Sequence, residues 1–165
     1  MLARQMIWRD FDVAAPELAR RGRERFERTG VVLVGTLRRD GSPRISPVEP
    51  YFVGSHLLLG MMSRSGKARD LLWDPRCSVH SSISDVNGSE GEFQVLGRAV
   101  LIEDDEVRRA DDSTWWQQLP PEACHVFSIE IDSATYVDWE IEKGIMSVTR
   151  WATGSGETQV RRPYP

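Results

Sequence analysis

The stretch from Ser63 to Asp70 carries the residue types best suited to bind an anion. Its sequence, Ser-Arg-Ser-Gly-Lys-Ala-Arg-Asp, brings hydroxyls and basic side chains together where a strand pattern gives way to a helical one. We predict that Ser65 caps the helix and that Lys67 lies in its first turn, where backbone N–H groups attract anions. With the Ser63 hydroxyl, these groups would suit a phosphate monoester.

An ordinary helix cap followed by exposed basic residues is the alternative interpretation of this stretch. Basic residues in a first turn oppose the helix dipole at a cost of roughly a few tenths of a kcal/mol. That penalty favours the phosphate interpretation.

The cysteines and histidines follow no metal-binding or catalytic spacing. Cys77 and Cys124 stand far apart without a CxxC pattern, so we interpret both as core thiols. His56, His80 and His125 form neither HxxxH nor HExxH, and we predict no metal site. The chain also lacks G-x-S-x-G, a Walker loop and G-x-G-x-x-G, the usual signals of nucleophile-elbow hydrolases, P-loop enzymes and Rossmann dehydrogenases.

Short strands joined by tight turns must position the anion-binding stretch. The predicted strands span residues 31–37, 43–53, 56–62, 77–83, 92–102, 126–142 (as one strand or two) and 144–151. The predicted helices span residues 16–28, 66–73 and 104–118. Six or seven strands of this kind predict a mainly β fold, a closed or nearly closed barrel with short helices.

The second predicted strand has an unusual composition. Pro43, Pro47 and Pro50 remove backbone donors from it, so it cannot be an ordinary central strand along its whole length. Its entry is a hairpin turn with Asp40-Gly41 at the centre.

The predicted helix over residues 16–28 is rich in arginine. Its arginines are Arg20, Arg21, Arg23, Arg25 and Arg28. We interpret this run as a solvated helix face or, alternatively, as a surface for the anionic tail of a ligand.

Length and composition indicate one domain. The 165 residues are 40% hydrophobic, no linker or repeat divides them, and we predict a single domain over residues 1–165. Within it, residues 1–29 form an N-terminal helical segment, and residues 154–165 have turn composition and are expected to be partly mobile.

Charge and hydropathy indicate where the protein works. The net charge of −4 argues against nucleic acid as a partner, and no apolar run approaches the ~20 residues of a membrane-spanning helix. The first residues have no apolar signal-peptide core, so we expect the cytoplasm.

The order of these elements and motifs resembles the pyridoxamine 5′-phosphate oxidase-like superfamily, also called the flavin/deazaflavin oxidoreductases, whose fold is the FMN-binding split barrel. The likeness covers roughly residues 30–104. The residues that carry it are Asp40-Gly41-Ser42-Pro43, Ser65-Gly66-Lys67, Leu71-Leu72, Asp74-Pro75-Arg76 and Gly97-Arg98-Ala99.

The resemblance implies a homodimer that holds a flavin-type cofactor between its subunits. Ser65 and Lys67 would hold the cofactor phosphate, and the second strand would run along the isoalloxazine ring. Either Trp139 or Trp151, both near the C-terminus, would wall the neighbouring subunit's cofactor. The implied cofactor-binding residues are Ser46, Pro47, Val48, Met61, Met62, Ser63, Ser65, Gly66, Lys67 and Trp139.

Several positions depart from the vitamin-forming oxidase. Ser46 and Gly66 stand where arginines would be expected, and Glu92 stands where a cofactor-contacting glutamine would be expected. The Arg-x-His substrate motif has no counterpart in residues 148–165. Pyridoxamine phosphate is therefore not the expected substrate, and the cofactor is FMN, the deazaflavin coenzyme F420, or another flavin or tetrapyrrole.

The main hypothesis for function is an oxidoreductase in which hydride passes between the cofactor and a small unsaturated or heteroaromatic substrate. No acid/base residue is assigned, and Arg44 and Glu92 are the candidates. The alternatives are a non-catalytic flavin, deazaflavin or tetrapyrrole carrier or sensor, and a scaffold that only dimerises.

Overall fold

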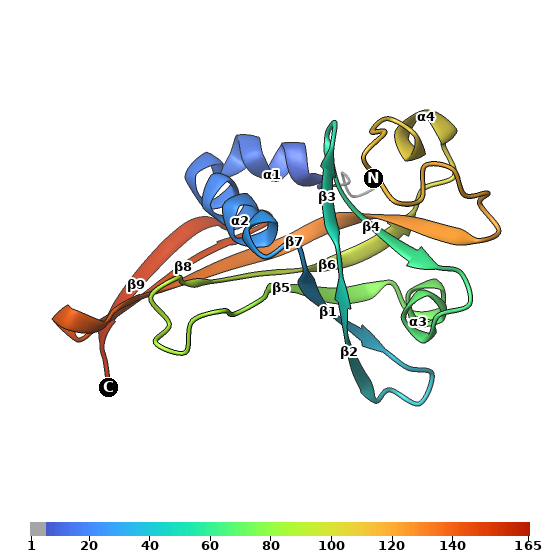
Figure 1. Ribbon diagram of the computed structural model, residues 1–165. Helices are drawn as coiled ribbons and strands as arrows, with labels where there is room; N and C mark the ends of the chain where they lie inside the picture. Colours follow the sequence, from blue (N-terminus) through green and yellow to red (C-terminus); the bar gives the residue numbers. More distant parts are fainter. Residues whose placement is uncertain (1–5) are drawn as a thin grey trace.

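The computed structural model describes residues 6–165, and its strands form one antiparallel sheet (Figure 1). The strands are β1 (Val32–Leu37), β2 (Pro43–Val48), β3 (Pro50–Val53), β4 (His56–Met62), β5 (Arg76–Ser81), β6 (Glu92–Leu101), β7 (Cys124–Glu140), β8 (Ile145–Ala152) and β9 (Gly156–Pro163). The mainly β class predicted from the sequence is therefore confirmed.

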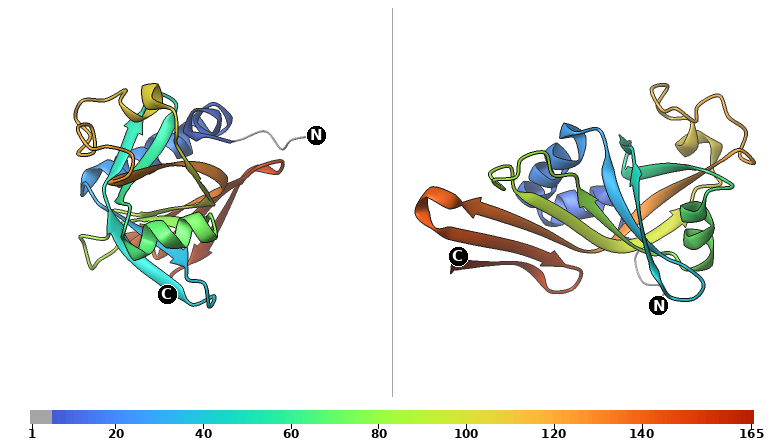
Figure 2. Two further views of the ribbon diagram at one scale, coloured as in Figure 1. Left: turned by 90° about the vertical axis from the view of Figure 1, so that its right-hand side faces the viewer. Right: turned by 60° about the horizontal axis from the view of Figure 1, so that its bottom comes forward.

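The sheet curls into an incompletely closed barrel. Its strands follow the order β2-β1-β5-β6-β7-β4-β3, with β8 added to β7 and β9 added to β8. The edge strands β2 and β3 follow one another in the chain, and no ladder joins them among the described residues. The end-on view in Figure 2 shows the strands wrapping round, with α3 (Gly66–Trp73) in front.

The predicted strand over residues 43–53 is two strands in the structure. β2 pairs only with β1 and β3 pairs only with β4. The strand is interrupted between them at Glu49. Proline has no N–H to donate, so Pro47 and Pro50 favour edge positions on both sides of the break. The composition correctly indicated an interrupted strand, but not a change of partner.

The other helices are α1 (Trp8–Ala14), α2 (Pro16–Arg28), α4 (Asp105–Arg108) and the short 3-10 helix η1 (Ile141–Lys143). α1 lies within the predicted N-terminal helical segment over residues 1–29, but no separate helix was predicted before Pro16. The predicted helix over residues 104–118 was wrong beyond Arg108. There, side chains form hydrogen bonds with backbone groups that a continuing helix would have paired with one another. The Asp111 carboxylate accepts the Ser113 N–H at 2.8 Å, and the Trp116 indole donates to the Arg108 carbonyl at 3.0 Å. None of the described helices has the length and apolar character needed to cross a membrane.

The core lies between the helical pair α1–α2 and the sheet. It is rich in rings, and its buried aromatic members are Trp8, Phe11, Phe26, Phe93, Phe127, Tyr136 and Trp151. A smaller cluster around Trp116 closes the other end. On β6, a Cβ on Gly97 would lie 1.9 Å from the Glu130 carbonyl oxygen, so only glycine allows the close approach of β6 and β7 at this bulge.

A β-arm extends from the barrel. The second half of β7 pairs with β8, and β8 pairs with β9, so these strands project to the far side from α3 (Figures 1 and 2). Every residue of β9 is exposed. The partly mobile tail expected for residues 154–165 from their turn composition was wrong over Gly156–Pro163, which form strand β9. Because β9 has no buried face, its residues show no apolar alternation that would have indicated a strand.

Candidate functional site

The start of α3 confirms the predicted helix cap. Ser65 is extended, and its Oγ accepts the Ala68 N–H at 3.3 Å. The first N–H groups of a helix have no acceptor within the helix, so those of Gly66 and Lys67 face outward. The hydroxyl of Ser63 instead donates to the Glu122 carbonyl at 2.6 Å, which commits it to the neighbouring loop.

A buried carboxylate fixes α3 to the β1–β2 hairpin. Asp70 Oδ2 accepts a hydrogen bond from the Thr36 hydroxyl at 2.8 Å and from Arg44 Nε at 2.7 Å. Thr36 and Arg44 are direct partners across the β1–β2 ladder, so both side chains lie on the same face. This joint determines how α3 sits against β2, and sequence reasoning missed it because the three residues are distant in the chain.

Beside this joint lies a cationic cavity of about 560 Å³. Three of its lining residues are arginines, and the only carboxylate among them is Asp70. The guanidinium of Arg39 lies 4.5 Å from the centre of the Trp73 ring. The lining residues are Arg39, Arg44, Gly66, Arg69, Asp70, Leu72 and Trp73. Such a cavity favours an anion with some apolar surface.

The predicted ring-contacting residues lie on both faces of the sheet. On β2, Ser46 and Val48 share the inward face with Arg44, whereas Pro47 is exposed on the outer face. At the end of β4, Met61 is 1% exposed and belongs to the core, while Met62 is 55% exposed. β2 is an edge strand, so its outer backbone groups are free to meet a polar ring.

Trp139 lies far from α3 within one protomer. It pairs with Met146 on the arm, while Cys124, at the other end of β7, pairs with Met62 just before α3. The fifteen steps of extended chain between them span roughly 50 Å. Its predicted contact with a neighbouring subunit's cofactor stays a prediction.

An apolar cavity of about 420 Å³ lies on the outer face of β2-β1-β5-β6. Its lining includes Ile45 and Leu96, which are both exposed, and Arg44, which also lines the cationic cavity. Cys77 lines it too, and burial raises the pKa of this thiol to about 12, so it is not a nucleophile at neutral pH.

The arginines of α2 do not form a free cationic surface. Arg25 is buried against Glu90, Arg21 pairs with Asp138, and the others with partners bond along the helix. Those pairs are Arg20 with Glu17 and Glu24, and Arg23 with Glu27. Carboxylates of the chain itself pair with four of the five arginines, which favours the interpretation as a solvated helix face, and binding of an anionic tail here stays a prediction.

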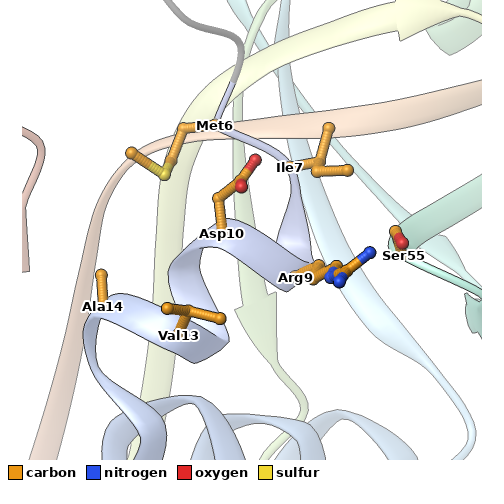
Figure 3. A pocket seen from close by; sticks show the side chains of 7 residues that line it. All are labelled: Met6, Ile7, Arg9, Asp10, Val13, Ala14 and Ser55. Atoms are coloured by element: carbon orange, nitrogen blue, oxygen red, sulfur yellow. The ribbon is translucent and has the colours of Figure 1, made fainter.

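The cavity beside α1 is poorer in groups that could do chemistry. Figure 3 shows a cavity of about 550 Å³ beside α1, where the Arg9 N–H donates to the Ser55 carbonyl at 3.1 Å. Its walls bring no set of like charges together. Within residues 6–165, no group of three or more His, Cys, Asp or Glu side chains could hold a metal ion.

Comparison with known proteins finds one matching family model and several solved structures of similar fold. A family model described as pyridoxamine 5′-phosphate oxidase matches residues 18–138. PhzG from Burkholderia lata 383, solved in complex with tetrahydrophenazine-1-carboxylic acid, is similar with a TM-score of 0.63 at 12% identity, over 93% of this chain and 91% of that one. No curated protein is similar enough in sequence to match.

Two further structures show how varied the ligands of this fold are. A pyridoxamine 5′-phosphate oxidase-related, FMN-binding protein from Nostoc punctiforme has a TM-score of 0.60 at 12% identity, over 92% of this chain and 96% of that one. A heme-binding protein from Mycobacterium smegmatis has a TM-score of 0.60 at 15% identity, over 87% and 88%. At such identities these neighbours establish the split-barrel fold alone.

Proposed function

The chain belongs to the pyridoxamine 5′-phosphate oxidase family, and on that basis we propose that it is a flavin- or deazaflavin-dependent oxidoreductase acting on a small unsaturated or heteroaromatic substrate. The observation that carries this proposal is the outward-facing start of α3 beside the cationic cavity. There Ser65 and Lys67 would hold the cofactor phosphate.

The residues that line the cationic and the apolar cavities fit a phosphorylated flavin better than a heme. A phosphate ester needs clustered N–H donors and positive charge, which Arg39, Arg44 and Arg69 supply around the cavity. No histidine lines either the cationic or the apolar cavity, so an imidazole ligand to heme iron is missing there. FMN and F420 both carry a phosphate group, and both remain within the proposal.

The protein's own part in catalysis is to bind, orient and exclude water. A bound flavin or deazaflavin would supply the hydride chemistry. The Nε of Arg44 donates to Asp70, so we assign this side chain to anion binding and not to general acid catalysis. Glu92 begins β6 opposite Val137 on the arm side, and within one protomer it does not line the cationic cavity.

We further propose that the cofactor binds between two copies of the chain. Exposed Leu33, Ile45 and Leu96 share the outer face that holds the apolar cavity, and burying them would favour association. Arg44 lines both cavities, so the cationic cavity lies next to the face on which the second copy would sit.

Equilibrium titration tests the cofactor site. The purified protein is titrated with FMN and, separately, with F420, following cofactor fluorescence. We expect micromolar or tighter binding of one of them, weakened about 10- to 100-fold in Lys67→Ala because a charge-assisted hydrogen bond is lost. Arg28→Ala removes an equal charge at an exposed position of α2 and should leave affinity unchanged. No binding of either cofactor would refute the proposal.

The dimer has its own test. Ile45→Glu places a charge on the outer face, and we expect light scattering to show monomers with weaker cofactor binding. Val13→Glu, at an exposed position of α1, is the matched control and should leave the assembly unchanged. A monomeric wild-type protein that binds cofactor at full affinity would contradict the proposed interface.

Turnover separates the enzyme from a carrier. The reduced cofactor, bound to the protein, is mixed with a panel of enones and quinones, and absorbance reports reoxidation without oxygen. We expect at least one acceptor to react faster with the complex than with free cofactor. A bound cofactor that is inert towards all of them would favour the non-catalytic carrier.

A further inference from the structure

The guanidinium of Arg44 lies directly over the first residue of α3. A Cβ built on Gly66 would fall 2.8 Å from Arg44 Cζ and Nη2 and 2.9 Å from Nη1. These distances are shorter than real contacts, so any side chain at position 66 would push the guanidinium away. The missing side chain of Gly66 is therefore the space that Arg44 fills.

Only one of the three nitrogens of the Arg44 guanidinium is hydrogen-bonded within the described residues. Nε donates to Asp70 Oδ2 at 2.7 Å, and the Thr36 hydroxyl fixes that carboxylate from β1 at 2.8 Å. Among the hydrogen bonds of the described residues, none uses Nη1 or Nη2 of Arg44. A fork of two nitrogens with this freedom matches two oxygens of a phosphate.

The surroundings favour an anion in front of this fork. The Asp70 side chain is 9% exposed and neutralises one charge, while Arg39 and Arg69 line the same cavity and form no ion pair with a carboxylate of residues 6–165. Lys67 follows Gly66 in the first turn. A phosphate bound here would therefore face positive charge from the β1–β2 hairpin and from α3.

We infer that Arg44 is the second phosphate-binding cation of the site, supplied from strand β2 across the gap opened by Gly66, with Asp70 and Thr36 as its positioning residues. The inference rests on the proposed function, because it assigns the phosphate of that cofactor. It also accounts for the glycine at position 66, where the family resemblance implies an arginine.

Paired ligands isolate the phosphate contact. FMN is compared with riboflavin, and F420 with the same deazaflavin lacking its phosphate tail, by fluorescence titration. In Arg44→Ala we expect the affinity for the phosphorylated ligand to fall about 10- to 100-fold while the phosphate-free ligand binds as before. Arg44→Lys should recover only part of the loss, because an ammonium cannot form the bidentate contact.

Exchanging the two positions tests the geometry. Gly66→Ala should weaken FMN binding several-fold, because its methyl group displaces the Arg44 fork. Arg44→Ala/Gly66→Arg moves the guanidinium onto the helix, and we expect it to bind FMN more tightly than Arg44→Ala alone. Thermal unfolding of each variant checks that the barrel is intact.

The outcomes separate the two levels of the argument. If wild-type protein binds FMN and Arg44→Ala binds it equally well, the assignment of Arg44 is overturned and the proposed function stands. If Arg44→Ala weakens FMN and riboflavin alike, Arg44 only supports the fold and the assignment is again overturned. If the wild type binds neither cofactor, the proposed function fails and the assignment fails with it.

Discussion

Two arginine-rich regions of this molecule differ in what their guanidinium groups already bind. On the α2 side, Arg25 is 4% exposed and meets Glu90, which is 2% exposed, and Arg21 meets Asp138 over the Tyr136 ring. On the α3 side, Arg44 contacts Asp70 through Nε alone, and its other two nitrogens remain available. We call the α2 region closed, because carboxylates of the chain pair with its guanidinium groups, and the α3 region open, because guanidinium nitrogens there remain unbonded within residues 6–165.

The difference shows that the number of arginines is a poor indicator of a ligand site. α2 carries five arginines, yet carboxylates of the chain take four of them. The cavity beside α3 has three arginines and one carboxylate, and it is the better anion site. What matters is the set of donors left over after the fold has paired its own charges.

The largest effect on stability should come from removing the Arg25–Glu90 ion pair of the closed region. In Arg25→Met the buried Glu90 loses its cation and the Ser82 carbonyl loses a donor, and we expect the melting temperature to fall by roughly 10 °C. Cofactor affinity at a temperature where the variant is folded should stay unchanged. Weaker FMN binding in folded Arg25→Met would break the proposed division between the two regions.

A smaller effect should appear at acid pH. Hydrogen bonds from the Asp85 N–H, the Ser84 hydroxyl and the Ser84 N–H, with the nearby Arg25, lower the pKa of Glu90 to about 2. An unfolded glutamate has a pKa of about 4.3, so Glu90 stabilises the fold above that pH, and this contribution is lost as pH falls towards 2.

The variant Glu90→Gln cannot titrate at this position. We expect its melting temperature to be lower than that of the wild type near neutral pH and to decline less steeply between about pH 5 and about pH 2.5. Parallel declines in the two proteins would show that the closed region does not depend on the Glu90 charge.

Local signals gave much of this fold correctly from sequence. α2 and α3 have the predicted bounds, because Pro16 and Ser65 mark their starts, and the Asp40-Gly41 turn correctly placed the β1–β2 hairpin. β9 was missed since it is exposed on both faces. The helix after Asp104 was overpredicted since side-chain hydrogen bonds to the backbone end it early.

The candidate site was predictable only in part. The helix cap and its lysine follow from consecutive residues, and their order is visible in the sequence. The joint of Thr36, Arg44 and Asp70 depends on ladder register and on the packing of α3, which no local pattern reports. The pairing of Arg25 with Glu90 is equally non-local, so the closed and open arginines look alike in sequence.

The most direct test of the account is a crystal structure of the protein with FMN. We predict a phosphate within hydrogen-bonding distance of the first N–H groups of α3, Lys67 Nζ and the free nitrogens of Arg44, with no rearrangement of the α2 ion pairs. A phosphate bound instead by the arginines of α2, or an FMN whose phosphate leaves α3 untouched, would contradict the account.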